Sequence, residues 1–84
     1  MPQPTQPTQP DNSPELFLDL RGMFPPEPME RVLDALTSLL PGQQIRLLIE
    51  REPHPLFRIL DSNNYRYTTT QPEPGLYQVV IQER

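Results

Sequence analysis

Cysteine is absent from this sequence of 84 residues, and so is lysine. Without cysteine the chain can form no disulfide and no thiolate metal site, and it can carry no persulfide or other cysteine nucleophile. Without lysine its seven basic residues are all arginines. Arginine suits bidentate anion recognition, but we attribute this bias to overall composition. Cysteine-dependent chemistry is therefore excluded.

Long apolar runs are also missing. No stretch approaches the roughly 18 apolar residues of a membrane span, and the N-terminus has neither the basic start nor the apolar run of a signal peptide. The formal net charge of −4 repels phosphate backbones. We therefore expect a soluble, cytoplasmic protein that does not enter membranes, and the charge disfavours nucleic acid as a partner.

The length of the chain allows one small domain. A chain of this size buries only about 60 % of its unfolded surface, which leaves little material to enclose a ligand pocket of roughly 300 Å3 or more. We therefore expect shallow binding sites. Residues 1–14 repeat proline, glutamine and threonine and offer no apolar face, so they are predicted to form a disordered tail. Residues 15–84 are predicted to form the domain.

Hydrophobic periodicity divides the domain into six elements. Alternating apolar residues predict strands, and apolar residues at spacings of three and four predict helices. The predicted strands span residues 15–20, 45–51, 65–70 and 76–82, and the predicted helices span residues 26–40 and 53–64. Pro41-Gly42 ends the first helix, and residues 71–75 have the composition of a turn.

The predicted order is β-α-β-α-β-β, which indicates an α/β (α+β) two-layer sandwich. The first two strands are joined through a helix and should be parallel, and the last two should pair as a hairpin. We therefore expect a mixed four-stranded sheet with two helices on one face. The other face should be open to solvent and polar, at Arg46, Arg66, Thr68, Thr70, Gln78 and Gln82.

Prolines crowd the start of the first predicted helix. We predict Pro25 as the N-cap, with Pro26 and Pro28 in the first turn, where a missing N–H costs nothing. Of positions 25–28 only Glu27 keeps a backbone N–H, and its carboxylate lies at the positive end of the helix dipole. Anion binding at this helix start is therefore poorly supported.

These residues resemble the LDxxGxxCPxP signature of the TusA/SirA-type sulfur carriers. Leu18-Asp19, Gly22, Pro26 and Pro28 match the signature, and Pro25 stands where the family's cysteine would be. In those carriers the cysteine holds the relayed sulfur as a persulfide. The resemblance extends over about residues 16–83 and implies the family's fold, but sulfur transfer is excluded here because the chain has no cysteine.

The sequence is more similar still to a cysteine-less branch of uncharacterised bacterial domains. That branch shares an LDxR start, which residues 18–21 match. It also shares a DPxPL motif, which residues 52–56 match with Glu52 in place of the aspartate and Pro53 as the first proline. Its members often lie near or within hemerythrin-like and iron–sulfur repair proteins. This resemblance implies a context and no activity.

No residue has the setting of a catalytic or metal-binding group. His54 is the only histidine, and one histidine without cysteine does not make a stable transition-metal site, so we place it on the surface at a helix start. Tyr65-Arg66-Tyr67 has a composition used to stack bases, but strand alternation puts both tyrosines on one face and Arg66 on the other. We therefore predict core tyrosines, no catalytic residue, no metal and no cofactor.

Two loops are predicted to form a docking surface. Loops at the carboxyl ends of parallel strands lie at the same edge of a sheet, so residues 21–25 and 51–55 should lie together. The candidate partner-binding residues at that edge are Arg21, Met23, Phe24, Glu27, Arg51, Glu52 and His54. Phe24 has two interpretations that the sequence leaves open: it meets a partner, or it packs on the first helical turn as a hydrophobic staple.

We therefore expect a non-enzymatic interaction or regulatory domain with a protein partner. Two alternatives stay open. The first is an RNA-binding module that uses the open face of the sheet. The second is a ligand- or cofactor-binding accessory domain that uses His54 and nearby carboxylates.

Overall fold

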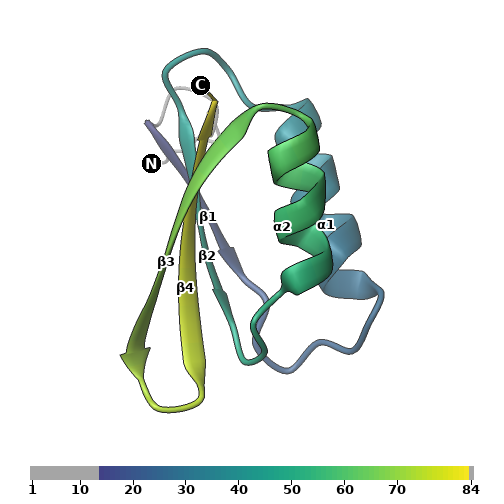
Figure 1. The fold of residues 1–84 in the computed structure, drawn as a ribbon, viewed down its shortest axis with the longest axis vertical. Helices are drawn as coiled ribbons and strands as arrows, with labels where there is room; N and C mark the ends of the chain where they lie inside the picture. Colours follow the sequence, from purple (N-terminus) through teal and green to yellow (C-terminus); the bar gives the residue numbers. More distant parts are fainter. Residues whose placement is uncertain (1–13, 84) are drawn as a thin grey trace, which may run out of the picture.

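The computed structural model describes residues 14–83 of the chain. Its elements follow one another in the predicted order β-α-β-α-β-β (Figure 1). They are β1 (Glu15–Asp19), α1 (Glu27–Thr37), β2 (Gln44–Ile49), α2 (His54–Ser62), β3 (Tyr65–Glu73) and β4 (Leu76–Glu83). The tail predicted over residues 1–14 lies, apart from Pro14, outside the described residues. Neither helix of the described part is long and apolar enough to cross a membrane.

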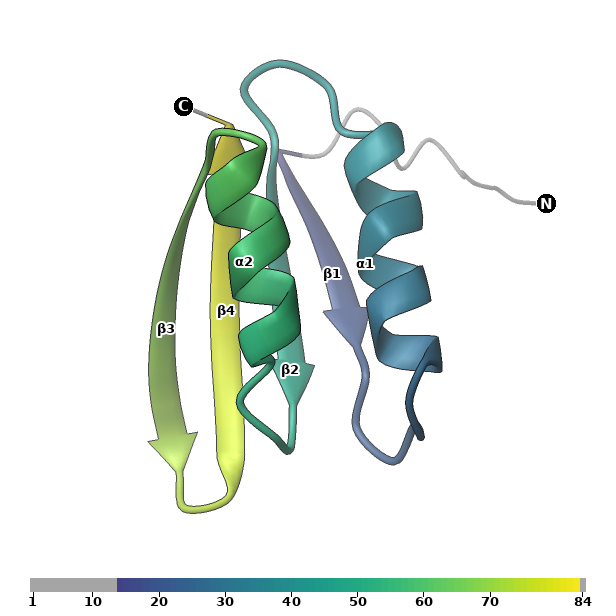
Figure 2. The same cartoon turned by 45° about the vertical axis from the view of Figure 1, so that its right-hand side comes forward.

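The sheet is mixed and four-stranded, with the order β1-β2-β4-β3. β1 is parallel to β2, and β4 is antiparallel to both of its neighbours, β2 and β3. Both helices lie on the same side of the sheet, with α1 near the β1 edge and α2 nearer β4 (Figure 2). The predicted two-layer architecture is confirmed.

The core lies between the sheet and the two helices, as strand alternation predicts. In β2 the inward side chains of Ile45 and Leu47 are fully buried, and their strand partners in β4, Ile81 and Val79, are buried with them. The other buried apolar residues are Leu20, Val32, Leu56 and Leu60. Tyr65 and Tyr67 pack against this core, whereas Arg66 between them is exposed. The tyrosines therefore face the helices.

The opposite face of the sheet is less polar than the sequence predicts. Arg66, Thr68 and Thr70 are exposed there, but the register also places Phe17, Leu48 and Val80 on this face. Phe17 keeps 54 % of its surface exposed. The strand β1 is an edge strand with no helix over its outer side, so its outward residues stay in contact with solvent whatever their polarity.

The helix α1 starts one residue later than predicted. Pro26, not Pro25, is the N-cap, because the Glu30 N–H donates the first helical hydrogen bond to the Pro26 carbonyl at 3.1 Å. The helix also ends earlier, at Thr37. The buried side chain of Gln43 accepts a hydrogen bond from the Leu40 N–H at 2.8 Å and holds residues 40–43 as a separate turn.

The other element ends differ by small amounts that local contacts explain. β2 ends at Ile49 rather than near Arg51. α2 ends at Ser62, because the Asn63 side chain donates to the Ile59 carbonyl at 2.8 Å and closes the last turn. β3 continues to Glu73, because the hairpin turn needs only Pro74 and Gly75, whose φ is +79°. The ladder is irregular between Thr70 and Glu73, which accommodates Pro72 and its missing N–H.

Candidate functional site

The loops that follow β1 and β2 lie side by side. The Leu20 N–H donates to the Leu48 carbonyl at 2.9 Å, which extends the parallel pairing by one step. The chain then turns at Arg21-Gly22, where Gly22 has a φ of +81° that side chains rarely adopt. The Gly22 N–H donates to Oε1 of Glu50 at 2.9 Å, so the two loops are joined directly.

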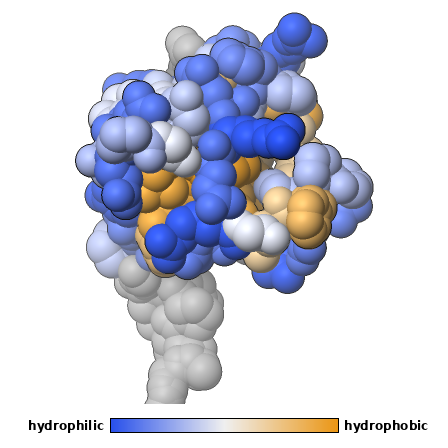
Figure 3. Space-filling view, turned by 90° about the horizontal axis from the view of Figure 1, so that it is seen from below, coloured by the Kyte–Doolittle hydropathy of each residue, from blue (hydrophilic) through white to orange (hydrophobic). Residues whose placement is uncertain are grey.

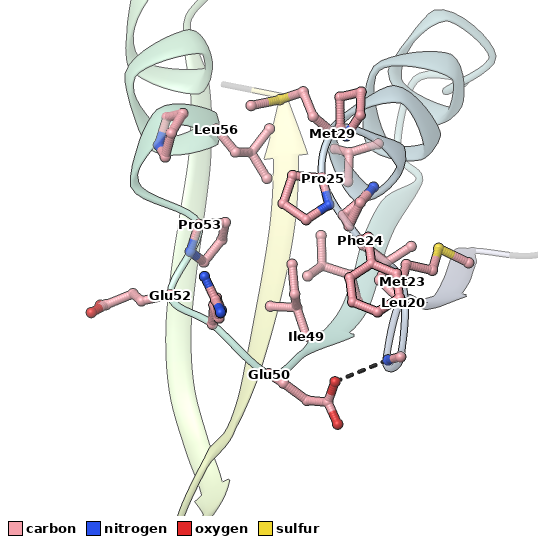
Figure 4. Close-up of a pocket in the computed structure, with 17 residues that line it drawn as sticks. Leu20, Met23, Phe24, Pro25, Met29, Ile49, Glu50, Glu52, Pro53 and Leu56 are labelled. Carbon is pink, nitrogen blue, oxygen red and sulfur yellow. Dashed lines mark hydrogen bonds between the residues drawn. The ribbon is translucent and has the colours of Figure 1, made fainter.

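A cleft of about 470 Å3 opens between these loops and the starts of the two helices. Figure 4 shows Met23, Phe24 and Pro25 on the side of α1, Pro53 and Leu56 on the side of α2, and Ile49 between them. The remaining lining residues are Leu20, Gly22, Pro26, Pro28, Met29, Val32, Leu47, Glu50, Arg51, Glu52 and Pro55. We call this feature the apolar cleft. It is larger than the shallow sites that chain length predicts, because two proline-rich loops add walls beside the core residues Leu20, Val32, Leu47 and Leu56.

The apolar cleft is bordered by charged residues. Figure 3 looks at this end of the molecule and shows apolar surface in patches between hydrophilic side chains. Ligand pockets in proteins have volumes of about 300–1,000 Å3 and mostly apolar walls with a few polar groups. The cleft therefore has the size and lining of a binding site for an apolar group.

The prolines leave few hydrogen-bond donors in the walls. Pro26 and Pro28 flank the first residue of α1, and Pro53 and Pro55 flank the first residue of α2. The Glu27 N–H between them donates to the Phe24 carbonyl at 3.0 Å, and the His54 N–H donates to the Glu52 carbonyl at 3.0 Å. At both helix starts, the N–H groups that could bind an anion are therefore either replaced by proline or already bonded to a carbonyl.

Phe24 is the most exposed large apolar residue of the described chain. It keeps 81 % of its surface exposed although it lines the apolar cleft. A hydrophobic staple would be buried against the first turn of α1, so the staple interpretation has no support. Met23, the preceding residue, is half-buried and packs against the core.

Arg21 lies outside the apolar cleft and is bound to Asp19. Its Nε and Nη2 donate to Oδ1 and Oδ2 of Asp19 at 2.9 and 2.8 Å, and its backbone N–H donates to Oδ1 at 3.2 Å. The Arg21 side chain first, and its N–H next, lower the pKa of Asp19 to about 2. Strand alternation explains the pair, because residues 19 and 21 point to the same side while Leu18 and Leu20 face the core.

The candidate docking residues do not all meet at one place. Met23, Phe24, Arg51 and Glu52 line the apolar cleft, whereas Arg21, Glu27 and His54 do not. Glu27 binds Arg31 at 3.0 Å along α1, and Nε2 of His54 lies 3.4 Å from Oε1 of Glu52. No group of three or more histidine, aspartate and glutamate residues that could hold a metal ion occurs within residues 14–83.

Sequence reasoning missed several residues of the apolar cleft. Met29 and Leu56 were assigned to helix faces, but each stands within the first turn beside a proline, where one side of the side chain borders the loops. An apolar residue directly after a proline in the first turn of a helix was therefore a sequence signal for the cleft. Glu50 gave none, because its contact with Gly22 joins residues that are 28 positions apart.

Residues 17–83 match the family described as "Uncharacterized conserved protein (DUF2249)". The chain belongs to this family. A solved structure, that of the SirA-like protein from Desulfitobacterium hafniense, is similar to this DUF2249 domain with a TM-score of 0.70 and 20 % sequence identity, over 79 % of this chain and 93 % of that one. This structural match shows a shared SirA-like fold, and the family match confirms the predicted relation to a family of uncharacterised domains. No curated protein matches the sequence.

Proposed function

We propose that this DUF2249 domain is a non-enzymatic interaction module that binds a protein partner through the apolar cleft. The observation that carries the proposal is the exposed ring of Phe24 at the wall of a cleft of about 470 Å3. Large aromatic residues next to an apolar pocket are typical anchors of protein interfaces. We place this activity in the cytoplasm, in keeping with the composition of the sequence.

The chemistry of the lining supports binding rather than catalysis. The walls consist mostly of proline, methionine, leucine, isoleucine and phenylalanine side chains, and the chain has no cysteine. His54, the single histidine, is exposed and lies outside the lining. Sulfur transfer is excluded, and the position of the sulfur-carrying cysteine is taken by Pro25, which is part of the wall.

RNA binding by the open sheet face has less support. Nε of Arg46 donates to Oε2 of Glu15 at 2.9 Å, and this contact first, followed by a hydrogen bond from Gln44, lowers the pKa of Glu15. Arg46 is therefore already neutralised by a carboxylate. The tyrosines that could stack bases face the helices. The exposed ring of Phe17 on β1 and the exposed Arg66 on β3 lie at opposite edges of the sheet, so they do not form one stacking surface.

The proposal is tested by affinity capture with two matched phenylalanine variants. Phe24→Ala removes the exposed ring at the cleft, and Phe17→Ala removes an exposed ring on the opposite face of the molecule. Tagged wild type and variants are incubated with lysate of the source cell, and bound proteins are identified by mass spectrometry. We expect at least one protein that binds wild type and Phe17→Ala and that Phe24→Ala loses.

Thermal melting of both variants serves as the control for folding. Phe24 is exposed, so its replacement should change the free energy of unfolding by no more than about 0.5 kcal/mol. Equal capture by wild type and Phe24→Ala would contradict the proposal. A small molecule that copurifies with wild type and is lost from Phe24→Ala, seen by native mass spectrometry, would instead support the accessory ligand-binding alternative.

A further inference from the structure

The charges around the apolar cleft are unevenly paired. Arg21 is bound to Asp19, and Arg31 is bound to Glu27, so two of the three arginines at this end of the molecule are neutralised. Arg51 lines the cleft and forms no ion pair with any described residue. Three carboxylates, those of Glu50, Glu52 and Glu73, have no arginine partner in the described chain, which leaves an excess of negative charge.

Glu50 occupies a particular position in this group. Its Oε1 accepts the Gly22 N–H, and its Oε2 makes no hydrogen bond or ion pair within residues 14–83. Figure 4 shows the Glu50 carboxylate directly below Ile49, on the side of the loop at Gly22, whereas the Glu52 carboxylate points away on the side of α2. Glu50 is therefore the carboxylate that borders the mouth of the cleft, whereas Oε1 of Glu52 lies 3.4 Å from Nε2 of His54.

Glu50 and Glu73, but not Glu52, also act on the charge of Arg21. Asp19 raises the pKa of Arg21 most, and Glu50 and Glu73 add to the effect. One guanidinium thus faces three carboxylates. A second cation that arrives with a partner would be attracted to Glu50, with Glu73 adding to the negative field. Opposite charges at the rim of an interface speed association and select partners.

We propose that the segment that enters the apolar cleft carries a lysine or arginine beside its large apolar side chain, and that Glu50 receives this cation. The inference rests on the proposed function and specifies the chemistry of the partner. The chain's own first 13 residues do not fit, because they contain no basic residue and no large apolar one except Met1. The occupant is therefore a segment of another protein.

Selection from a library of short random peptides tests the inference with the full chain. Enriched peptides are resynthesised, and binding is measured by fluorescence polarisation. We expect enrichment of an aromatic or aliphatic residue next to lysine or arginine. Replacing that cation by glutamine should weaken binding by about two- to fivefold, the range for exposed ion pairs. Raising salt from about 0.1 M to about 1 M should weaken it similarly, since the Debye length falls from about 10 to about 3 Å.

Three glutamate variants test which carboxylate binds the cation of the peptide. Glu50→Gln removes the charge but keeps an oxygen that can accept the Gly22 N–H, so the loops stay joined. We expect Glu50→Gln to weaken binding by about two- to fivefold, and Glu52→Gln, whose carboxylate points away from the cleft, to weaken it less. Glu83→Gln, the same change at the far end of β4, should leave binding unchanged.

The outcomes separate this inference from the proposed function. Peptides that need Phe24 but bind equally well with the cation replaced, or enriched peptides that are acidic, would overturn the inference and leave the proposed function standing. No peptide that depends on Phe24 would overturn both. If the wild type self-associates with rising concentration and the Phe24→Ala variant does not, the occupant of the cleft is a second copy of the chain. That result would overturn the inference.

Discussion

The carboxylate of Asp19 is held by its neighbour Arg21 through hydrogen bonds from the side chain and from the backbone N–H. This contact explains why the LDxR start of the domain joins an acid and a base two residues apart. It also explains why Arg21 was a poor candidate for docking, since its guanidinium already has a carboxylate partner. Side chains on one face of a strand can pair in this way without any tertiary contact.

Titration of Asp19 is expected to report this contact. The pKa of Asp19 is about 2 in the folded chain, against about 3.9 for an unperturbed aspartate. The folded pKa is the lower one, so the contact stabilises the fold above about pH 4 and this contribution is lost as the pH falls toward about 2. NMR should give a titration midpoint at about pH 2 for the Asp19 carboxyl group. The Arg21→Ala variant should raise this midpoint toward about 3.9.

Arg31→Ala is the matched control for that titration, because Arg31 pairs with Glu27 and not with Asp19. The Asp19 midpoint should not move in this variant. A midpoint near about 4 in the wild type would show that the contact does not persist in solution, where water screens exposed charges.

Helix α2 depends on a few inward side chains. Leu56 and Leu60 are buried, and Phe57 stacks on Tyr67 of β3 with ring centroids 4.7 Å apart and an interplanar angle of 7°. The Tyr67 hydroxyl reaches Oδ2 of Asp61 at 3.3 Å, so the same helix also receives the polar end of this ring. A short helix of nine residues is too short to be stable alone and takes its stability from such packing.

Leu60→Ala should therefore lower the free energy of unfolding by about 2–5 kcal/mol, the range for truncation of a buried leucine. Leu40→Ala is the comparison, because Leu40 is 45 % exposed, and its change should stay within about 0.5 kcal/mol. Urea denaturation followed by circular dichroism measures both. Similar losses for the two variants would mean that α2 is not packed as described.

The elements show which features could be predicted from the sequence. Alternation in Ile45 and Leu47 is a local signal, and it predicted both the strand and its buried face. The predicted end of α1 was wrong because Leu39 and Leu40 continue the helical spacing of apolar residues. The helix ends at Thr37, and the side chain of Gln43 closes a separate turn that periodicity does not reveal. The exposure of Phe24 stayed open because burial depends on what the rest of the chain brings near a loop.

At the scale of the whole molecule, a fold used by SirA-like proteins occurs here without a cysteine. A shared fold does not imply a shared function, because function belongs to the site built on it. In this DUF2249 domain the prolines at the starts of both helices are part of the walls of the apolar cleft.

Removal of residues 1–13 tests whether these residues contribute to the stability of the domain. Their proline, glutamine and threonine residues offer no apolar area that could offset the cost of ordering the chain. Pro14 is retained, because its carbonyl accepts the Gln44 N–H at 3.0 Å. The melting temperature of the shortened chain should stay within about 2 °C of the full chain. A larger decrease would show that these residues contribute to the domain's stability.

The position of β4 in the sheet governs when the sheet can be completed during synthesis. β4 follows every other element in the chain but lies between β2 and β3. A chain that grows on the ribosome therefore holds β2 and β3 apart, each with an unpaired edge, until residue 83 has been made. Unpaired edges invite association with other strands. A nascent chain of this domain would gain most from a chaperone during the interval between the synthesis of Ile49 and that of Glu83.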